Sequence, residues 1–149
     1  MFLGTSSFVL KPTQTTDEQK LRKLTEDTYY AVCNGNWELF SNSWYHSSKV
    51  HLMHPDNGVW LKGWEEIKSI YEPSVKSGMK CNISVNDLVI NISKSGEMAW
   101  VITDITVKYG NDPNSQPSHM WEIVVWEKID GQWKGVLAQS TTPKISIKE

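Results

Sequence analysis

The chain changes its hydrophobic period once, near Lys80. Before that point apolar residues recur at helical spacing, and after it they fall into β-rich runs separated by turn residues. Helices followed by a series of antiparallel strands are typical of an α+β domain, in which the helices cover one face of the sheet. A chain of 149 residues is long enough to build one such domain around its own core.

The first two helices are predicted by their end signals. Thr16 and Gln19 form a capping box, which starts a helix over residues 17–34. Gly35 stops that helix, because glycine readily adopts the left-handed conformation. The following Asn36 caps a short second helix.

A short strand and a third helix are expected before the change of period. Residues 50–54 alternate as a strand, and the turn residues that follow end at Gly58. The third helix begins near Gly63. Pro73 is expected to end or kink it, because proline lacks the backbone N–H that a helix needs.

The second half of the chain predicts a sheet of long strands. Its β-rich runs cover residues 81–92, 98–109, 119–129 and 132–141. A phase change near Asp87 indicates a β-bulge in the first of these strands. A long bent sheet with helices against one face encloses a cone, and the mouth of a cone admits a ligand.

The expected domain covers residues 16–143, with a loose arm over residues 1–15 and a tail over residues 144–149. A net charge of −2 argues against a broad nucleic-acid surface, because phosphate binding needs clustered basic residues. No stretch approaches the ~20 apolar residues of a membrane span, and the first residues lack the basic region of a signal peptide. We therefore expect a cytoplasmic protein that binds neither nucleic acid nor membrane.

Cysteine and histidine positions bear on the redox compartment and on metal binding. Cys33 and Cys81 lie far apart and make neither a metal knuckle nor a disulfide framework, so we expect buried free thiols in a reducing compartment. His51 and His54 leave opposite faces of the expected strand, and His46 and His119 have no ligand-spaced partner. No glycine-rich phosphate loop follows a strand. The sequence therefore predicts neither a metal nor a cofactor.

Several local segments, taken in order, carry a family resemblance. They are Gly35-Asn36-Trp37-Glu38-Leu39-Phe40, His54-Pro55 with Gly58, Lys62-Gly63-Trp64-Glu65-Glu66-Ile67, Gly96-Glu97-Met98-Ala99-Trp100-Val101 and Asp130-Gly131-Gln132-Trp133-Lys134. With these segments the chain resembles the SnoaL-like and ketosteroid-isomerase-like proteins of the nuclear transport factor 2-like superfamily. The resemblance implies a cone-shaped α+β fold with a curved antiparallel sheet, a ligand pocket and a homodimer. It does not specify a reaction, because this fold hosts isomerases, cyclases, dehydratases, carriers and oligomerisation modules.

His54 is the first candidate for chemistry. It occupies the position at which the ketosteroid isomerases carry a proton-moving carboxylate before a proline. A histidine suits general-base work there, because its unperturbed pKa of about 6.5 lies close to neutrality. The other interpretation is a histidine that only makes a structural hydrogen bond.

The same resemblance gives further candidates. The oxyanion-binding tyrosine of the isomerases matches Tyr29 or Tyr30 in the first helix, and Glu122 is the carboxylate nearest to their second oxyanion donor. Asp104 interrupts an apolar run and is another candidate acid if its side chain points inward. The alternative is a packing or surface role for each, and Trp121 belongs to the apolar face that would turn Glu122 outward.

Aromatic residues are numerous, and the chain contains eight tryptophans. The side chains expected to line the pocket are Trp37, Phe40, Trp44, Leu52, Trp60, Trp64, Trp100 and Trp121. The predicted function is an isomerase or cyclase that removes a proton next to the carbonyl of a small apolar or carbonyl-containing ligand. The alternatives are a non-catalytic ligand-binding domain and a homodimeric interaction module, which exposed aromatics such as Trp126 or Trp133 would favour.

Overall fold

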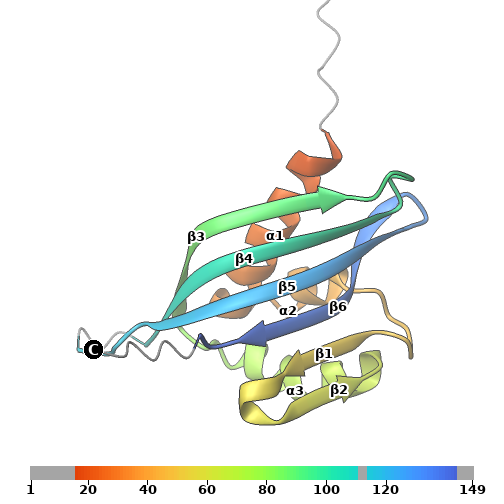
Figure 1. Cartoon of the computed structure of the whole chain (residues 1–149). Coiled ribbons are helices and arrows are strands. Elements are labelled where there is room, and N and C mark those ends of the chain that lie inside the picture. The colour runs from red at the N-terminus through yellow and green to blue at the C-terminus, as the bar shows by residue number, and fades with distance from the viewer. Residues whose placement is uncertain (1–15, 111–113, 144–149) are drawn as a thin grey trace, which may run out of the picture.

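The computed structural model describes residues 16–110 and 114–143. In chain order the elements are α1 (Asp17–Asn34), α2 (Trp37–Ser43), β1 (His51–His54), a 3₁₀ turn (Pro55–Asn57), β2 (Val59–Lys62), α3 (Trp64–Lys76), β3 (Cys81–Ile92), β4 (Met98–Tyr109), β5 (Ser118–Ile129) and β6 (Gln132–Thr141). The helices lie behind one face of a curved sheet (Figure 1). The expected arm and tail lie outside the described residues.

The ends of α1 are those predicted. The Thr16 hydroxyl accepts a hydrogen bond from the Gln19 backbone at 3.2 Å, and the Gln19 side chain accepts one from the Thr16 backbone at 2.9 Å. Gly35 is left-handed, with φ of 75°. Pro73 does not end α3 but lies within its last turn, and the helix continues to Lys76. Among the described residues no helix is both long enough and apolar enough to cross a membrane.

The sheet has the strand order β2-β1-β6-β5-β4-β3. The predicted α+β cone is confirmed, but the sheet is mixed, because β1 pairs with β6 in parallel. β1 precedes every other strand and β6 is the last, so local turn signals carry no information about this pairing. β2 was not expected, and it pairs with β1 through a turn that ends at the left-handed Gly58.

The core fills the space between the helices and the concave face of the sheet. Two ring stacks hold α2 to α3. Trp37 stacks on Trp64 with ring centres 5.8 Å apart, and Phe40 stacks on Tyr71 at 5.3 Å. Below them Ile67 is fully buried, and a side chain of that size contributes about 1.5–3 kcal/mol to stability on burial. The helices are therefore held in a fixed position against the concave face of the sheet.

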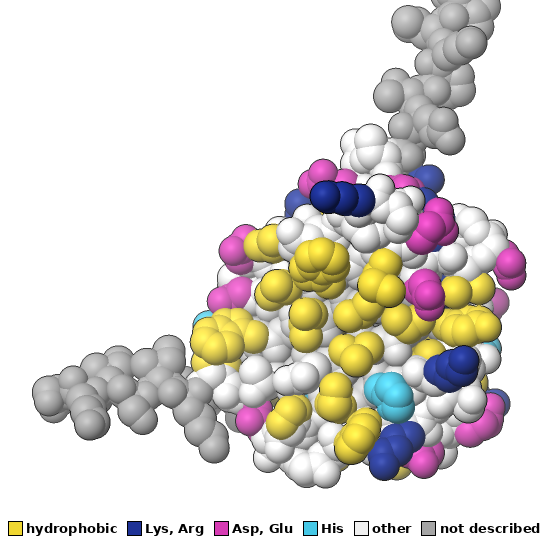
Figure 2. All heavy atoms as spheres, turned by 45° about the vertical axis from the view of Figure 1, so that its right-hand side comes forward, with side chains coloured by type: hydrophobic (Ala, Val, Ile, Leu, Met, Phe, Trp, Pro, Cys, Tyr) yellow, Lys and Arg dark blue, Asp and Glu magenta, His cyan; other side chains and the backbone are white. Residues whose placement is uncertain are grey.

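The middle strands are apolar on both faces. On β4, Val101 is fully buried while its neighbour Ile102 is 43% exposed. Trp121 on β5 is 48% exposed, so the expectation that it faces the core is wrong. Trp126 and Trp133, considered as exposed aromatics, are buried instead. When both faces of a strand are apolar, the alternation of residues does not show which face is buried. The pairing with neighbouring strands determines it. Hydrophobic side chains gather on the outer surface (Figure 2).

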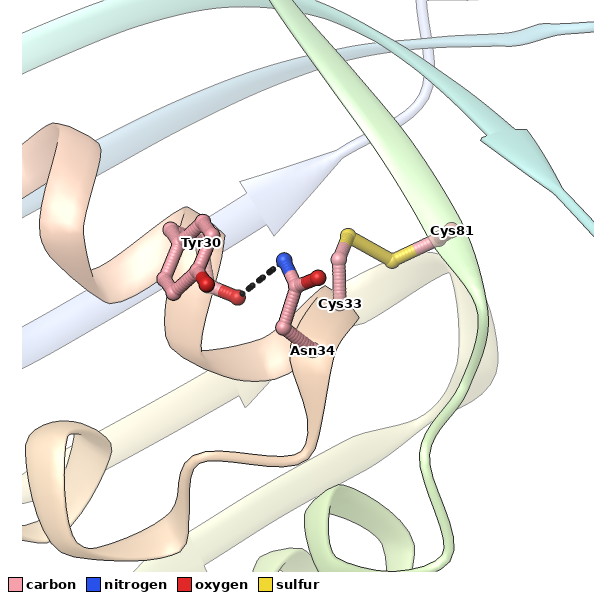
Figure 3. Close-up of a disulfide and its surroundings, with 4 residues drawn as sticks. All are labelled: Tyr30, Cys33, Asn34 and Cys81. Atoms are coloured by element: carbon pink, nitrogen blue, oxygen red, sulfur yellow. Dashed lines mark hydrogen bonds between the residues drawn. A yellow bond between two sulfur atoms is a disulfide. The ribbon is translucent and has the colours of Figure 1, made fainter.

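A disulfide joins Cys33, near the end of α1, to Cys81, at the start of β3 (Figure 3). The two Cα atoms are 4.7 Å apart, although 48 residues separate them in the sequence. The expectation of free thiols is therefore wrong. Packing of α1 against β3 brings the cysteines together, and their spacing does not reveal that long-range contact. In the chain-entropy account, closing a loop of this length stabilises a fold by about 4 kcal/mol.

Candidate functional site

A cavity of about 380 Å³ lies between the helices and the concave face of the sheet. Small-molecule sites commonly have volumes of roughly 300–1,000 Å³. Most of the wall is apolar and includes Val32, Phe40, Trp44, Leu52, Ile70, Ile105, Val107, Met120, Val124 and Trp126. The described residues that line it include no lysine or arginine. A wall of this kind suits a mostly apolar molecule.

One line of polar side chains crosses the concave face, and we call it the polar row. Thr103 of β4 pairs directly with Glu122 of β5, and Glu122 pairs with Ser140 of β6. The last pair in the parallel register of β1 with β6 is Met53 with Gln139. The next residue on each strand is His54 and Ser140, so these two lie side by side. The row therefore takes one residue from each of four adjacent strands.

Glu122 is the half-buried acid of the polar row, and it lines the cavity. Its Oε1 accepts a hydrogen bond from the Tyr29 hydroxyl at 2.9 Å, and its Oε2 accepts one from the Ser140 hydroxyl at 2.6 Å. Burial raises the pKa of Glu122, and the hydrogen bonds from Ser140 and Tyr29 offset only part of that rise. The protonated form of this carboxyl is therefore favoured more than that of an exposed glutamate.

Tyr29 reaches the polar row from α1. Its hydroxyl lies 2.6 Å from the Thr103 hydroxyl as well as bonding to Glu122. Burial, followed by the charge of Glu122, raises the pKa of Tyr29 well above its ordinary value. Tyr29 is therefore a neutral phenol at physiological pH, able to give one hydrogen bond and to accept others.

A second hydrogen-bonded pair joins β1 to α3. His54 Nε2 lies 2.6 Å from the Tyr71 hydroxyl, and the Tyr71 ring is held by its stack on Phe40. Burial lowers the pKa of His54, opposed by the nearby charge of Asp56, so the imidazole is neutral at pH 7. Burial, then the charge of Glu122, raises the pKa of Tyr71. Both partners are thus neutral.

Three of the residues predicted for chemistry line this one cavity. His54, Tyr29 and Glu122 come from β1, α1 and β5. They form two hydrogen-bonded groups, Tyr29 with Glu122 and His54 with Tyr71. Over residues 16–110 and 114–143, no group of three or more His, Cys, Asp or Glu side chains is placed to hold a metal ion.

Two predicted residues lie outside the cavity. Tyr30 is 58% exposed on α1, because one residue along a helix turns the side chain by about 100° away from Tyr29. Asp104 lies on the outer face, because strand alternation turns its neighbour Thr103 inward. There Asp104 accepts hydrogen bonds from His119 at 2.5 Å and from the Trp121 indole at 3.2 Å. Neither residue can act in the cavity.

The predicted pocket residues also divide. Those that line the cavity are Phe40, Trp44 and Leu52. Those that stack in the core without lining it are Trp37 and Trp64. Those that are exposed are Trp60, Trp100 and Trp121. The last group is wrong because each side chain points to the outer face of its strand.

Sequence reasoning missed three residues that line the cavity, namely Ser140, Tyr71 and Trp126. It also missed the buried Thr103, whose hydroxyl contacts that of Tyr29. Thr103 had a usable signal, because it is the polar residue in the buried phase of β4, between Val101 and Ile105. Tyr71 stood in the apolar stripe of α3, where nothing marks a hydroxyl as functional. The buried indole N–H of Trp126 has no hydrogen-bond partner among the described residues.

Comparison with known families matches residues 21–142 to the SnoaL-like domain. Among solved structures, the fold is similar to a nuclear transport factor 2-like superfamily protein from Salmonella enterica, with 18% identity and a TM-score of 0.72 over 87% of this chain and 92% of that one. It is similar to a protein from Streptomyces avermitilis named "putative dehydratase", with 17% identity and a TM-score of 0.75 over 87% and 97%.

The association domain of the Caenorhabditis elegans kinase CaMKII has 15% identity and a TM-score of 0.70, over 84% of this chain and 95% of that one. Comparison with curated proteins gives no significant match. At these identities the solved structures show a shared fold, and the chemistry rests on the residues of the cavity.

Proposed function

The chain belongs to the SnoaL-like domain family, and from that premise we propose that it is an enzyme acting on a small apolar carbonyl compound. It removes a proton from the carbon next to the carbonyl, as an isomerase or cyclase does. The observation that carries the proposal is the meeting of His54, Tyr29 and Glu122 in one apolar cavity, although they are far apart in the sequence. Polar side chains that serve only to contact solvent lie on the surface and do not gather in an apolar cavity.

His54 is the proposed base. Its lowered pKa keeps the imidazole neutral, so a lone pair is available near pH 7. Nε2 is engaged with Tyr71, whereas Nδ1 makes no hydrogen bond with the described residues. Nδ1 is therefore the atom that takes the proton. A positioned general base contributes about 100-fold to 10,000-fold in rate.

Tyr29 and Glu122 are the proposed stabilisers of the carbonyl oxygen. When Glu122 is ionised, the Tyr29 hydroxyl donates its one hydrogen bond to that carboxylate and has none left for a ligand. When Glu122 is protonated, it can donate to Tyr29, and the Tyr29 proton is then free for the ligand. The raised pKa of Glu122 supports this second state.

The cavity supports a neutral substrate. An anionic group would be desolvated beside Glu122 with no cationic side chain among the described lining residues. We therefore propose a mostly apolar compound that carries one or two oxygen atoms.

The test is hydrogen exchange next to a carbonyl. β-Tetralone is incubated with the protein in deuterated water, and loss of its acidic C–H signals is followed by NMR. We expect catalysed exchange, a loss of at least about 100-fold in His54→Gln, and no change in the control Tyr30→Phe. Exchange that persists in His54→Gln contradicts the assignment of the base. Quenching of tryptophan fluorescence by β-tetralone without any exchange supports the alternative, a non-catalytic ligand-binding domain.

A second proposal concerns assembly. The outer face of the sheet exposes Val89, Met98, Trp100, Ile102 and Trp121, and Figure 2 shows hydrophobic side chains gathered there. Apolar patches of this kind mark association surfaces. We propose that two copies pair through this face as a homodimer. Trp100→Glu is expected to give a monomer by sedimentation velocity, whereas Tyr30→Glu, which alters an exposed aromatic on the helix side, is expected to leave the dimer intact.

The compartment is a third proposal. The sequence alone favoured the cytoplasm, where thiols stay reduced. The Cys33–Cys81 disulfide instead supports an oxidising compartment, because such bonds persist there. Alkylation of the protein in freshly lysed native cells, followed by mass spectrometry, decides between the two. Unmodified cysteines indicate the disulfide, and two added alkyl groups indicate the reduced form.

A further inference from the structure

We infer that Thr103 is a positioning residue for the proposed reaction: its hydroxyl donates to Tyr29 and so leaves the Tyr29 hydrogen for the carbonyl oxygen of the ligand. This inference rests on the proposed function and deepens it. Thr103 does not line the cavity, so it acts only through Tyr29. Neither the sequence pattern nor the family resemblance assigns it a role.

The direction of the bond between the two hydroxyls follows from the burial of Thr103. The Tyr29 and Thr103 oxygens are 2.6 Å apart, and each is able to donate or accept. Thr103 is 2% exposed, and among the described residues Tyr29 is the only hydrogen-bond partner of its hydroxyl. If Tyr29 donated, the Thr103 hydrogen would be buried without an acceptor, which is costly. Thr103 is therefore the donor.

Tyr29 has different surroundings. It lines the cavity, and its hydroxyl has a second neighbour in Oε1 of Glu122, at 2.9 Å. A hydroxyl donates one hydrogen bond and accepts up to two. Because Thr103 donates to Tyr29, the Tyr29 hydrogen has two destinations left, namely Glu122 and a ligand in the cavity.

The proton of Glu122 decides between these destinations. When Glu122 is ionised, the hydrogens of Thr103, Tyr29 and Ser140 fill the contacts Thr103–Tyr29, Tyr29–Glu122 and Glu122–Ser140, and none is left over. When Glu122 is protonated, four hydrogens share these three contacts, so one is left over. Thr103 does not hold it, and the other three groups all line the cavity. The protonated network therefore presents one hydrogen to a ligand.

The two contacts of Glu122 place that hydrogen on Tyr29. Ser140 lies 2.6 Å from Oε2, which is closer than Tyr29 lies to Oε1. The shorter bond keeps its direction, so Ser140 still donates to Oε2, and the proton of the acid stands on Oε1 and points at Tyr29. Tyr29 then accepts from Thr103 and Glu122 together. Both bonds strengthen Tyr29 as a donor, because hydrogen bonds in a chain polarise one another.

Neutron diffraction of the deuterated wild-type protein tests the direction of the bond without any ligand. We expect deuterium on the Thr103 oxygen, pointing at Tyr29, whether Glu122 is ionised or protonated. Deuterium on Tyr29 that points at Thr103 overturns the inference.

Thr103→Val tests the consequence for the reaction, because it removes the hydroxyl and nearly keeps the shape of the side chain. With β-tetralone in deuterated water, we expect kcat for exchange to fall about tenfold while KM stays nearly constant. Thr103→Ser keeps the donor and is expected to restore most of the rate. Thr106→Val is the matched control, because it makes the same change on the outer face of the same strand. An undiminished kcat in Thr103→Val overturns the inference.

The infrared carbonyl stretch of bound β-tetralone separates positioning from packing. A hydrogen bond from Tyr29 lowers this frequency, and we expect a smaller lowering in Thr103→Val than in wild-type protein or Thr103→Ser. A packing role would lower the unfolding temperature of Thr103→Val and leave the bound frequency unchanged, which contradicts the inference.

The outcomes also distinguish this inference from the function on which it rests. If wild-type protein binds β-tetralone without exchanging it, the proposed function fails, and the neutron and infrared results still decide whether Thr103 directs the Tyr29 hydrogen. If exchange is lost in His54→Gln but runs at full rate in Thr103→Val, the base stands and the role of Thr103 is wrong.

Discussion

The two faces of β4 and β5 place polar groups in opposite ways. On the concave face the buried Thr103 and the half-buried Glu122 are directly paired, and both bond to Tyr29. On the outer face their chain neighbours Asp104 and Trp121 are directly paired, more exposed, and bonded to each other. One step along a strand therefore changes both the burial of a side chain and its hydrogen-bond partners. In this sheet, the burial and the hydrogen-bond partners of a polar side chain depend more on the face on which it lies than on its chemical type.

The two carboxylates make the contrast sharpest. Burial raises the pKa of Glu122, whereas hydrogen bonds from Asn86 and His119 lower the pKa of Asp104 on the open face. The cavity thus favours the protonated form of its acid, and the open face favours the ionised form of its acid. Four experiments test how far this contrast extends.

The largest effect is expected from placing the same charge on each face. Val101→Asp buries an unpaired carboxylate, and we expect it to lower the free energy of unfolding by about 5 kcal/mol. Ile102→Asp changes the next residue on the exposed face and is expected to cost the monomer less than about 1 kcal/mol. Urea denaturation of both variants is the measurement. Equal losses would mean that the two faces are not distinct.

The disulfide holds the helix that carries Tyr29 over the concave face. The double change Cys33→Ser with Cys81→Ser is expected to lower the free energy of unfolding by about 4 kcal/mol, through the greater freedom of the unfolded chain. Denaturation of oxidised wild-type protein provides the reference. Reductant should reproduce the loss in wild-type protein and have no effect on the double variant. A loss below about 1 kcal/mol would show that packing alone fixes α1 on β3.

Adjacent tyrosines give a smaller contrast. Tyr29→Phe removes a hydroxyl bonded to Glu122 and Thr103. It leaves Glu122 Oε1 and the Thr103 hydroxyl without that partner, which is expected to cost about 1–2 kcal/mol of unfolding free energy. Tyr30→Phe removes an exposed hydroxyl and is expected to change it by less than about 0.5 kcal/mol. Thermal unfolding of the pair is sufficient. A stable Tyr29→Phe protein would indicate that water replaces the lost hydroxyl.

The smallest effect is a pair of opposite pH slopes. The pKa of Glu122 is raised above 4.5, so its contribution to stability is present at low pH and is lost as pH rises through the raised value. The pKa of Asp104 is lowered below 3.8, so its contribution is present above that value and is lost as pH falls. Unfolding free energy measured against pH should lose its alkaline slope in Glu122→Gln and its acid slope in Asp104→Asn. Identical slopes in both variants would contradict the assignment.

Local signals predicted much of the fold. The ends of α1, the glycine turns and the β-rich runs depend on residues within a few positions of one another, and short-range chemistry specifies them. The parallel pairing of β1 with β6 and the strand β2 depend on contacts between distant segments. The Cys33–Cys81 bond is of the same kind, because it reports where α1 meets β3 and not any spacing.

The site was predictable to the same extent. His54 was found from its place before Pro55. Tyr29 could not be separated from Tyr30 until the rotation of α1 was known. Glu122 was expected to face either way, because tryptophan, isoleucine and valine beside it made the opposite face look like the core. Tyr71 became visible only through its contact with His54.

The side chains of the polar row have a fixed spacing, because each one stands on a different strand of the same sheet. Neighbouring strands in a sheet lie about 4.8 Å apart, so a line of side chains across four strands spans about 14 Å. Each strand supplies one side chain of the row. A substitution at Thr103, Glu122, Ser140 or His54 therefore changes one side chain and leaves the positions of the other three unchanged. The separation of any two of these side chains is therefore set by the hydrogen bonding of the strands, in steps of about 5 Å, whichever residue type stands at each position.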